Sequence, residues 1–157
     1  MITEQNYRSI GWTATRLARH VELALATIDL STAQYRMLLQ LAQGDEASTS
    51  LARKLAVSAP SVTAVVDGFV NRGAIERTHS EEDRRRVSLA LTPIGRAILD
   101  QAEAVVSARL EGIADELESE ASIRAALGAL DLWAEALEKS RARRLALRES
   151  PIEVSPR

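Results

Sequence analysis

The chain of 157 residues contains no cysteine, only two histidines and only 3% aromatic residues. The missing thiols exclude disulfide bonds, thiolate metal ligands and thiol-based redox sensing. With so few imidazoles, no regulatory metal site and no cofactor are expected. The start of the chain shows no basic region followed by an apolar run. No stretch approaches the roughly 18 unbroken apolar residues of a membrane helix. These absences predict a soluble cytoplasmic protein that does not associate with membranes.

Catalytic motifs are missing from the sequence as well. No nucleophile stands beside a base, and no glycine-rich phosphate loop or metal-binding motif is visible. An enzyme is therefore not expected.

The residues that are present favour helices. Hydrophobic residues make up 46% of the chain, with alanine and leucine recurring throughout, and 27% of the residues are charged. The formal net charge of −2 argues against a protein that coats nucleic acid indiscriminately. It leaves room for a local basic patch, which site-specific DNA binding requires.

Apolar residues recur at steps of three and four in six segments, which predicts helices. These helices are expected over residues 2–28, 33–43, 48–56, 59–72, 93–118 and 122–148. Two short strands are expected over residues 74–79 and 87–91, joined by a charged turn at 80–86. This order predicts a mainly α fold, with a winged helix-turn-helix and a small two-stranded β wing.

The expected organisation has four parts. Residues 1–30 form an N-terminal helix, 31–92 the winged helix-turn-helix, 93–148 two C-terminal helices and 149–157 a disordered tail. The apolar stripes of the long helices exceed what a module of about 60 residues needs to cover itself. We therefore expect them to be buried against a second copy in a symmetric homodimer.

The helix at residues 59–72 has a small, polar outer face. Ser58 is its expected N-cap, and Ala59, Ser61, Thr63 and Ala64 are the candidate DNA contacts along it. A helix that enters the major groove must bring its backbone close to the DNA, and bulky side chains would prevent this. A solvated face that happens to be small explains the same pattern equally well.

The charged turn is the more specific feature. It contains Asp83, Arg84, Arg85 and Arg86 at the tip of the expected hairpin. Guanidinium groups suit phosphates and a narrow minor groove, and Asp83 can hold a neighbouring arginine by a bidentate contact. Solvated charge runs are common, but a basic hairpin directly after the helix at residues 59–72 favours a DNA-binding function. Seven cations and five anions between Ser48 and Thr92 give this module a net charge of +2.

Residues 51–92 resemble the MarR (multiple antibiotic resistance regulator) family of bacterial winged helix-turn-helix transcriptional regulators. The run LARKLAVSAPSVTAVVDGFVNRGAIER is similar to the family's helix-turn-helix. Asp83-Arg84-Arg85, followed by Leu91-Thr92 and Gly95, matches its D-x-R and L-T-x-x-G wing signature. The resemblance implies an obligate homodimer that binds a near-palindromic operator in double-stranded DNA.

The same resemblance implies roles for individual residues. Arg85 would enter the minor groove, steadied by Asp83, while Ser58, Ser61 and Thr63 contact the major groove or its phosphates and Arg77 lies near the backbone. The family often has arginine where this chain has Ala64. That departure removes a direct base contact, so the operators of relatives do not predict the one read here.

A ligand response is also implied by the resemblance. Family members often bind small aromatic or anionic molecules between the DNA-binding module and the dimer helices, which releases DNA and makes repression ligand-responsive. Trp12, Arg16 and His20 recur at four-residue spacing along the first helix and are candidates for such a pocket. Interface packing explains Trp12 and His20 as well. A rival to the repressor hypothesis is a winged-helix adaptor that binds proteins, which has no need of a basic wing.

Overall fold

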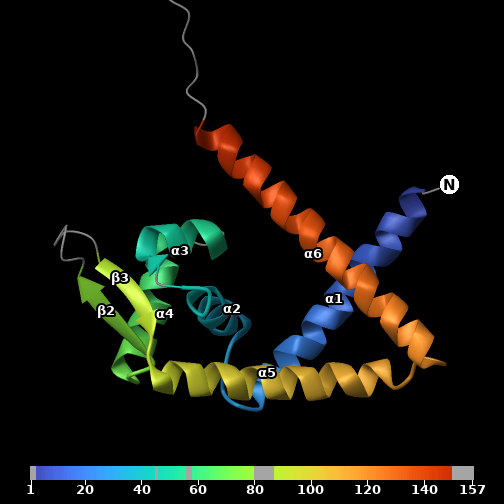
Figure 1. Cartoon of the computed structure of the whole chain (residues 1–157), viewed down its shortest axis with the longest axis horizontal. Coiled ribbons are helices and arrows are strands. Elements are labelled where there is room, and N and C mark those ends of the chain that lie inside the picture. The colour runs from blue at the N-terminus through green and yellow to red at the C-terminus, as the bar shows by residue number, and fades with distance from the viewer. Residues whose placement is uncertain (1–2, 45, 56–57, 80–86, 150–157) are drawn as a thin grey trace, which may run out of the picture. The chain divides into compact units, whose positions relative to one another are not determined.

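Helices dominate the computed structural model, which describes residues 3–44, 46–55, 58–79 and 87–149 (Figure 1). Within those residues the order is α1 (Glu4–Ala26), α2 (Thr32–Leu41), β1 (Glu46–Ala47), α3 (Ser48–Leu55), α4 (Ala59–Asn71), β2 (Ile75–His79), β3 (Val87–Leu91), α5 (Pro93–Ala114) and α6 (Glu120–Glu149). The mainly α winged-helix fold is as the sequence predicts. The chain divides into two compact units, Met1–Gly112 and Ile113–Arg157.

Helix ends follow their capping residues. Asp29, with a φ of 54°, interrupts the helical conformation after α1. Ser31 then caps α2: its hydroxyl accepts from the Gln34 backbone N–H at 3.2 Å, and the Gln34 side chain accepts from the Ser31 N–H at 2.8 Å. Helix α5 begins at Pro93 as expected but ends at Ala114, a turn earlier than residue 118.

The core of the first unit lies between the helices and one face of the sheet. Its largest fully buried side chains are Leu25, Met37, Leu38, Leu51, Val62, Val66, Phe69, Ile75 and Leu89. Leu99 and Ala102 of α5 pack into the same cluster. Burying one such large apolar side chain stabilises a fold by about 1.5–3 kcal/mol. The inner face of α4 supplies three of these residues, so the core holds this helix with its other face outward.

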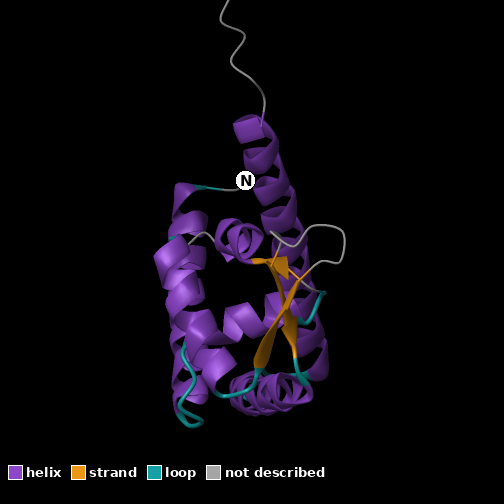
Figure 2. Ribbon diagram, turned by 90° about the vertical axis from the view of Figure 1, so that its left-hand side faces the viewer, coloured by secondary structure: helices purple, strands orange, loops and turns teal. Residues whose placement is uncertain are grey.

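The sheet has one strand more than the sequence predicts. Strands β2 and β3 pair antiparallel from Ile75 opposite Leu91 to His79 opposite Val87 (Figure 2). The two-residue strand β1 pairs with the other edge of β3, which gives the order β1-β3-β2. Two residues are too short to show the alternation by which a strand is recognised. The hairpin was therefore predictable, whereas β1 was not.

The end of α4, the end of β3 and the start of α5 meet in one closely packed junction. Gly73 ends α4 in the left-handed conformation, with a φ of 66°. The Thr92 hydroxyl donates to the Gly73 carbonyl at 2.6 Å and accepts from the Gly95 N–H at 3.2 Å. A Cβ on Gly95 would lie 2.0 Å from the carbonyl oxygen of Ala74, so only glycine fits there. This junction fixes the base of the hairpin against the end of α4.

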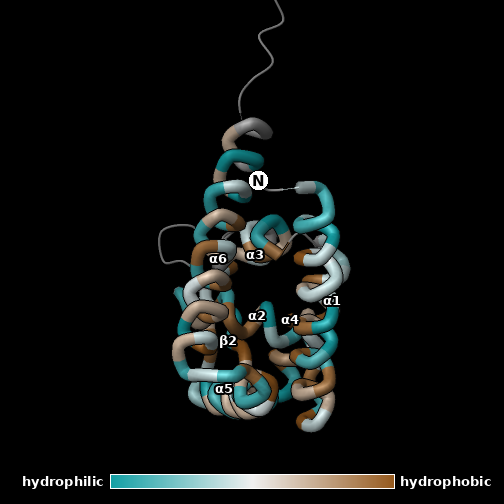
Figure 3. Tube along the Cα trace, turned by 90° about the vertical axis from the view of Figure 1, so that its right-hand side faces the viewer, coloured by the Kyte–Doolittle hydropathy of each residue, from teal (hydrophilic) through white to brown (hydrophobic). Residues whose placement is uncertain are grey.

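The second unit contains the end of α5 and helix α6. Hydrophilic and hydrophobic residues alternate along α6 (Figure 3). Its large exposed apolar side chains are Leu127, Leu130, Leu132, Trp133 and Leu137. Across the described part of the chain, no helix combines the length and apolarity needed to cross a membrane.

Candidate nucleic-acid interface

Helix α4 begins at a serine cap. The Ser58 hydroxyl accepts from the Ser61 backbone N–H at 3.3 Å and lies 2.7 Å from the Ser61 hydroxyl. Ala59 opens the helix and Pro60 stands in its first turn, where a missing N–H leaves no acceptor unsatisfied. The start of α4 therefore presents two hydroxyl groups at the positive end of the helix dipole. That combination suits an anionic oxygen.

The two faces of α4 differ sharply in exposure. Val62, Val66 and Phe69 are at most 1% exposed. The opposite face is exposed and consists of Ser61, Thr63, Ala64, Asp67 and Gly68. Because no side chain there is larger than aspartate, the backbone of α4 can approach a partner surface closely. The burial pattern is the one that the sequence predicts.

Arg77 lies on β2 and contacts the outer face of α4. Its guanidinium Nη2 forms an ion pair with Oδ1 of Asp67, and both side chains are about half exposed. The Arg72 guanidinium, at the end of α4, stacks on the Phe69 ring with 4.8 Å to its centroid. Arg77 is thus the cation that the structure brings to the small outer face.

The predicted tip of the wing contains Asp83, Arg84, Arg85 and Arg86, all of which lie outside the described residues. The strands on either side, β2 and β3, are described and pair along their whole length. Any role for the tip residues therefore stays a prediction.

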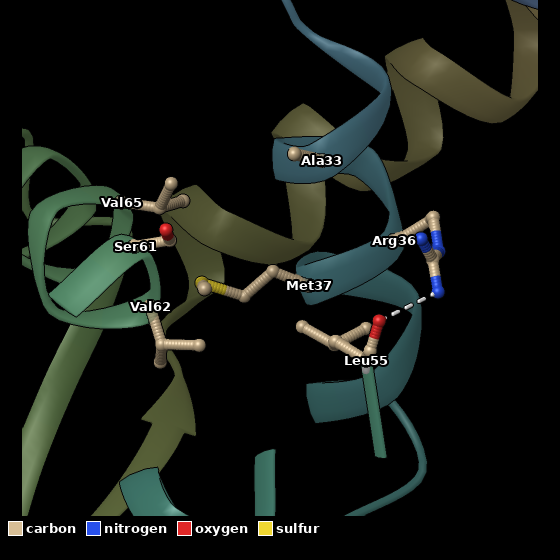
Figure 4. Close-up of a pocket in the computed structure, with 7 residues that line it drawn as sticks. All are labelled: Ala33, Arg36, Met37, Leu55, Ser61, Val62 and Val65. Atoms are coloured by element: carbon tan, nitrogen blue, oxygen red, sulfur yellow. Dashed lines mark hydrogen bonds between the residues drawn. The ribbon is translucent and has the colours of Figure 1, made fainter. Parts of the chain in front are cut away.

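A second arginine connects α2 to α3, the first helix of the helix-turn-helix. Arg36 of α2 donates through Nη2 to the Leu55 carbonyl oxygen at 3.0 Å, as the dashed line in Figure 4 marks. Leu55 is the last residue of α3, where a cation also favours the negative end of the helix dipole. A small cavity beside this contact is lined by Ala33, Arg36, Met37, Leu55, Ser61, Val62 and Val65.

The candidate effector residues all lie on α1, but the structure does not gather them into one pocket. Trp12 is 68% exposed, and Arg16 is exposed as well. His20 is half-buried, and its Nδ1 accepts a hydrogen bond from Arg109 Nε of α5 at 3.1 Å. Arg109 also lines a wide hollow between α1 and α5, together with Leu23, Ala24, Thr27, Val105 and Ala108. His20 is thus hydrogen-bonded to a residue that lines that hollow.

Tyr35 of α2 has a pKa above its ordinary value. Burial raises the pKa of its hydroxyl, and the nearby Glu103 carboxylate raises that pKa further. The phenol therefore stays protonated at neutral pH and can donate a hydrogen bond. Among the described residues, no cluster of histidine, aspartate and glutamate has the arrangement of a metal site.

Comparison with known proteins finds a family that is similar to the central part of the chain. The MarR family model matches residues 30–87, which run from the end of the first helical segment to the start of β3. Over this segment the chain is similar to the MarR family. A curated relative, the HTH-type transcriptional repressor YetL of Bacillus subtilis, is 31% identical over 94 residues. That match spans 55% of this chain and 56% of YetL, or about half the length of the curated relative.

Solved structures show the same MarR fold along most of the chain. RV1404 from Mycobacterium tuberculosis superposes with a TM-score of 0.72 at 24% identity, covering 87% of this chain and 95% of RV1404. The transcriptional repressor CouR, bound to a 23-mer DNA duplex, gives a TM-score of 0.66 at 29% identity, covering 84% and 92%. YetL and CouR are both named as transcriptional repressors, the class of protein that the sequence predicts.

The geometry explains part of the MarR wing signature. In L-T-x-x-G, the threonine is Thr92 and the glycine is Gly95, the two residues of the junction between α4, β3 and α5. This half of the signature is therefore structural. The contacts that the sequence does not predict include Asp67 with Arg77 and Arg36 with the Leu55 carbonyl. Each joins different elements, and no spacing within one helix or strand reports such a pair.

Proposed function

We propose that the protein is a homodimeric, cytoplasmic transcriptional repressor that binds a near-palindromic operator in double-stranded DNA. The observation that carries this proposal is the outer face of α4, which is small, exposed and begins at a hydroxyl-capped N-terminus. A recognition helix needs these properties, because its backbone must come close to the bases and phosphates of the major groove. The match of residues 30–87 to the MarR family model and the likeness to DNA-bound CouR support the same function.

Under this proposal the two parts of the module contact different parts of the DNA. Ser58, Ala59, Ser61, Thr63 and Ala64 face the major groove and its phosphates. Arg77, Asp83, Arg84, Arg85 and Arg86 form the second set, in which Arg77 lies near the backbone and the wing tip enters the minor groove. The module's net charge of only +2 means that affinity depends on two correctly spaced half-sites more than on bulk attraction.

We further propose that a small aromatic or anionic effector binds near α1 and releases the DNA. The support is a cation, Arg109, at a hollow with apolar walls, together with His20 beside it. Trp12 and Arg16 lie two turns and one turn before His20 on the same helix. Such a ligand must favour the form that does not bind DNA by a few kcal/mol in order to release it. Loss of a DNA gel shift on addition of aromatic acids tests this part.

The test of DNA binding starts from DNA fragments selected by the purified protein from a random library. The selected site, measured by fluorescence anisotropy at several salt concentrations, is then compared with the double variant Arg84→Ala/Arg85→Ala. We expect weaker binding and a salt dependence flatter by roughly 0.9 for each phosphate that the variant no longer neutralises.

The matched control is Arg143→Ala/Arg144→Ala, which removes the same charge from exposed positions on α6. This control should change affinity far less than the wing variant. Equal affinities for the wing variant and the parent would remove the wing tip from the mechanism. A protein that selects no sequence at all would instead favour the adaptor hypothesis.

A further inference from the structure

Asp67 is the only charged residue of α4, and it lies on the face that we propose to meet DNA. Its side chain is 51% exposed, so burial in the core does not explain its presence. A carboxylate at this position repels the phosphates of an approaching duplex. An anion in such a place therefore requires a specific explanation.

The partner of Asp67 provides one. Oδ1 of Asp67 binds Nη2 of Arg77, which stands ten residues later on β2, beyond the Gly73 turn. The contact connects the recognition helix to the first strand of the wing. Both side chains are about half exposed, and exposed ion pairs of this kind contribute little to the stability of a fold. The pair is thus better explained by the position in which it holds Arg77 than by a contribution to the stability of the fold.

We propose that Asp67 is a positioning residue for DNA binding, which fixes the Arg77 guanidinium beside the outer face of α4 so that it can bind a backbone phosphate. This inference rests on the proposed function. A guanidinium carries five N–H donors in a rigid plane, and the contact with Asp67 leaves the others available. A phosphate group can accept two of them side by side.

Positioning and charge have opposite effects on affinity, which makes the inference testable. If charge alone mattered, the change Asp67→Asn would tighten DNA binding by removing an anion from the interface. If Asp67 positions Arg77, the same change releases a flexible side chain that must then be ordered on binding. Ordering one such side chain weakens binding by roughly 2- to 10-fold. The sign of the effect separates the two explanations.

The experiment measures the affinity of the full-length protein for the DNA site that the parent selects. The variants are Asp67→Asn, Arg77→Ala and the two combined, with Glu76→Gln as the matched control. Glu76 is an exposed carboxylate on the same strand, and its side chain leaves the strand on the opposite side from that of Arg77. We expect Asp67→Asn to weaken binding, Glu76→Gln to leave it unchanged or tighter, and urea unfolding midpoints to stay close to the parent value.

The combined variant identifies the route of the effect. Because Asp67 acts through Arg77, the change Asp67→Asn should not weaken binding further once Arg77 is alanine. Tighter or unchanged binding by Asp67→Asn alone, or an equal weakening in both backgrounds, overturns the inference and leaves the repressor proposal standing. A parent protein that selects no DNA overturns both.

Discussion

Single residues decide how the wing is attached to the recognition helix. Gly95 lies so close to the Ala74 carbonyl that an added Cβ would overlap the oxygen, and the Leu91 side chain would be only 2.9 Å away. Backbone atoms on either side of this contact cannot move without disturbing the Thr92 hydrogen bonds. The position accepts no side chain, although α5 is helical there and alanine is otherwise the better helix former.

We therefore predict that Gly95→Ala destabilises the protein by about 1–3 kcal/mol, because the overlap forces the end of α4 and the start of α5 apart. Urea denaturation followed by circular dichroism gives the free energy of unfolding. The control is Gly68→Ala on α4, where an added Cβ meets nothing within 4 Å. That change should stabilise the protein by about 0.5–1 kcal/mol. Equal effects of the two changes would contradict the structural reason given for the L-T-x-x-G signature.

How far the sequence predicts individual residues depends on the range of their contacts. The Ser58 cap and the exposure of Ser61 and Thr63 follow from helix periodicity and capping chemistry, which act within a few residues. The pairing of Asp67 with Arg77 depends on the path of the chain around Gly73. That path is a property of the folded module, so the pair became visible only in the structure.

At the scale of elements, the N-terminus of α4 serves two purposes that substitutions can separate. The Ser58 hydroxyl caps the helix, and in the proposed complex it also faces a phosphate. Replacing it with alanine removes the cap, and we predict a loss of about 1 kcal/mol from the free energy of unfolding. Replacing it with aspartate keeps a cap and suits the helix dipole, but places a negative charge beside the DNA.

The expected outcome is that Ser58→Asp unfolds at the same urea concentration as the parent or higher, yet binds the selected DNA more weakly than Ser58→Ala does. Unfolding curves and anisotropy titrations of the two variants test both halves. An aspartate variant that bound DNA as well as the parent would show that the start of α4 does not approach a phosphate.

The elements themselves were largely predictable. Six helices and the hairpin follow from the periodicity of apolar residues and from Ser31, Ser58 and Thr92 at helix starts. The end of α5 was placed too late because apolar residues continue past Ala114 to Leu117, which is in fact exposed. Periodicity reports which side of a helix is apolar, but it does not report where the backbone leaves the helix.

At the scale of the whole molecule, the proposed function requires two copies. A single recognition helix reads one half-site, and a near-palindromic operator matches a two-fold symmetric dimer. The apolar residues of α6 offer the surface for such contact. At about 100° per residue, Leu127, Leu130 and Leu137 share one face of the helix, whereas Leu132 lies on the opposite face. The first face has the spacing of a seam between helices.

We predict that the parent sediments at about twice 17.1 kDa at micromolar concentration, and that Leu130→Glu/Leu137→Glu shifts it toward the monomer. Two buried carboxylates in an apolar seam would lack partners, so dimerisation should weaken by several orders of magnitude. Leu132→Glu, which changes another exposed leucine, on the other face of α6, should remain dimeric. The monomeric variant should also lose affinity for the selected DNA while keeping its helical circular dichroism. The winged helix-turn-helix stays folded in this variant, but the second half-site is no longer bound.

If the variant kept full affinity as a monomer, the two half-sites would not be read by one dimer. If Leu132→Glu dissociated as readily as the double variant, the seam would not lie on the face proposed here.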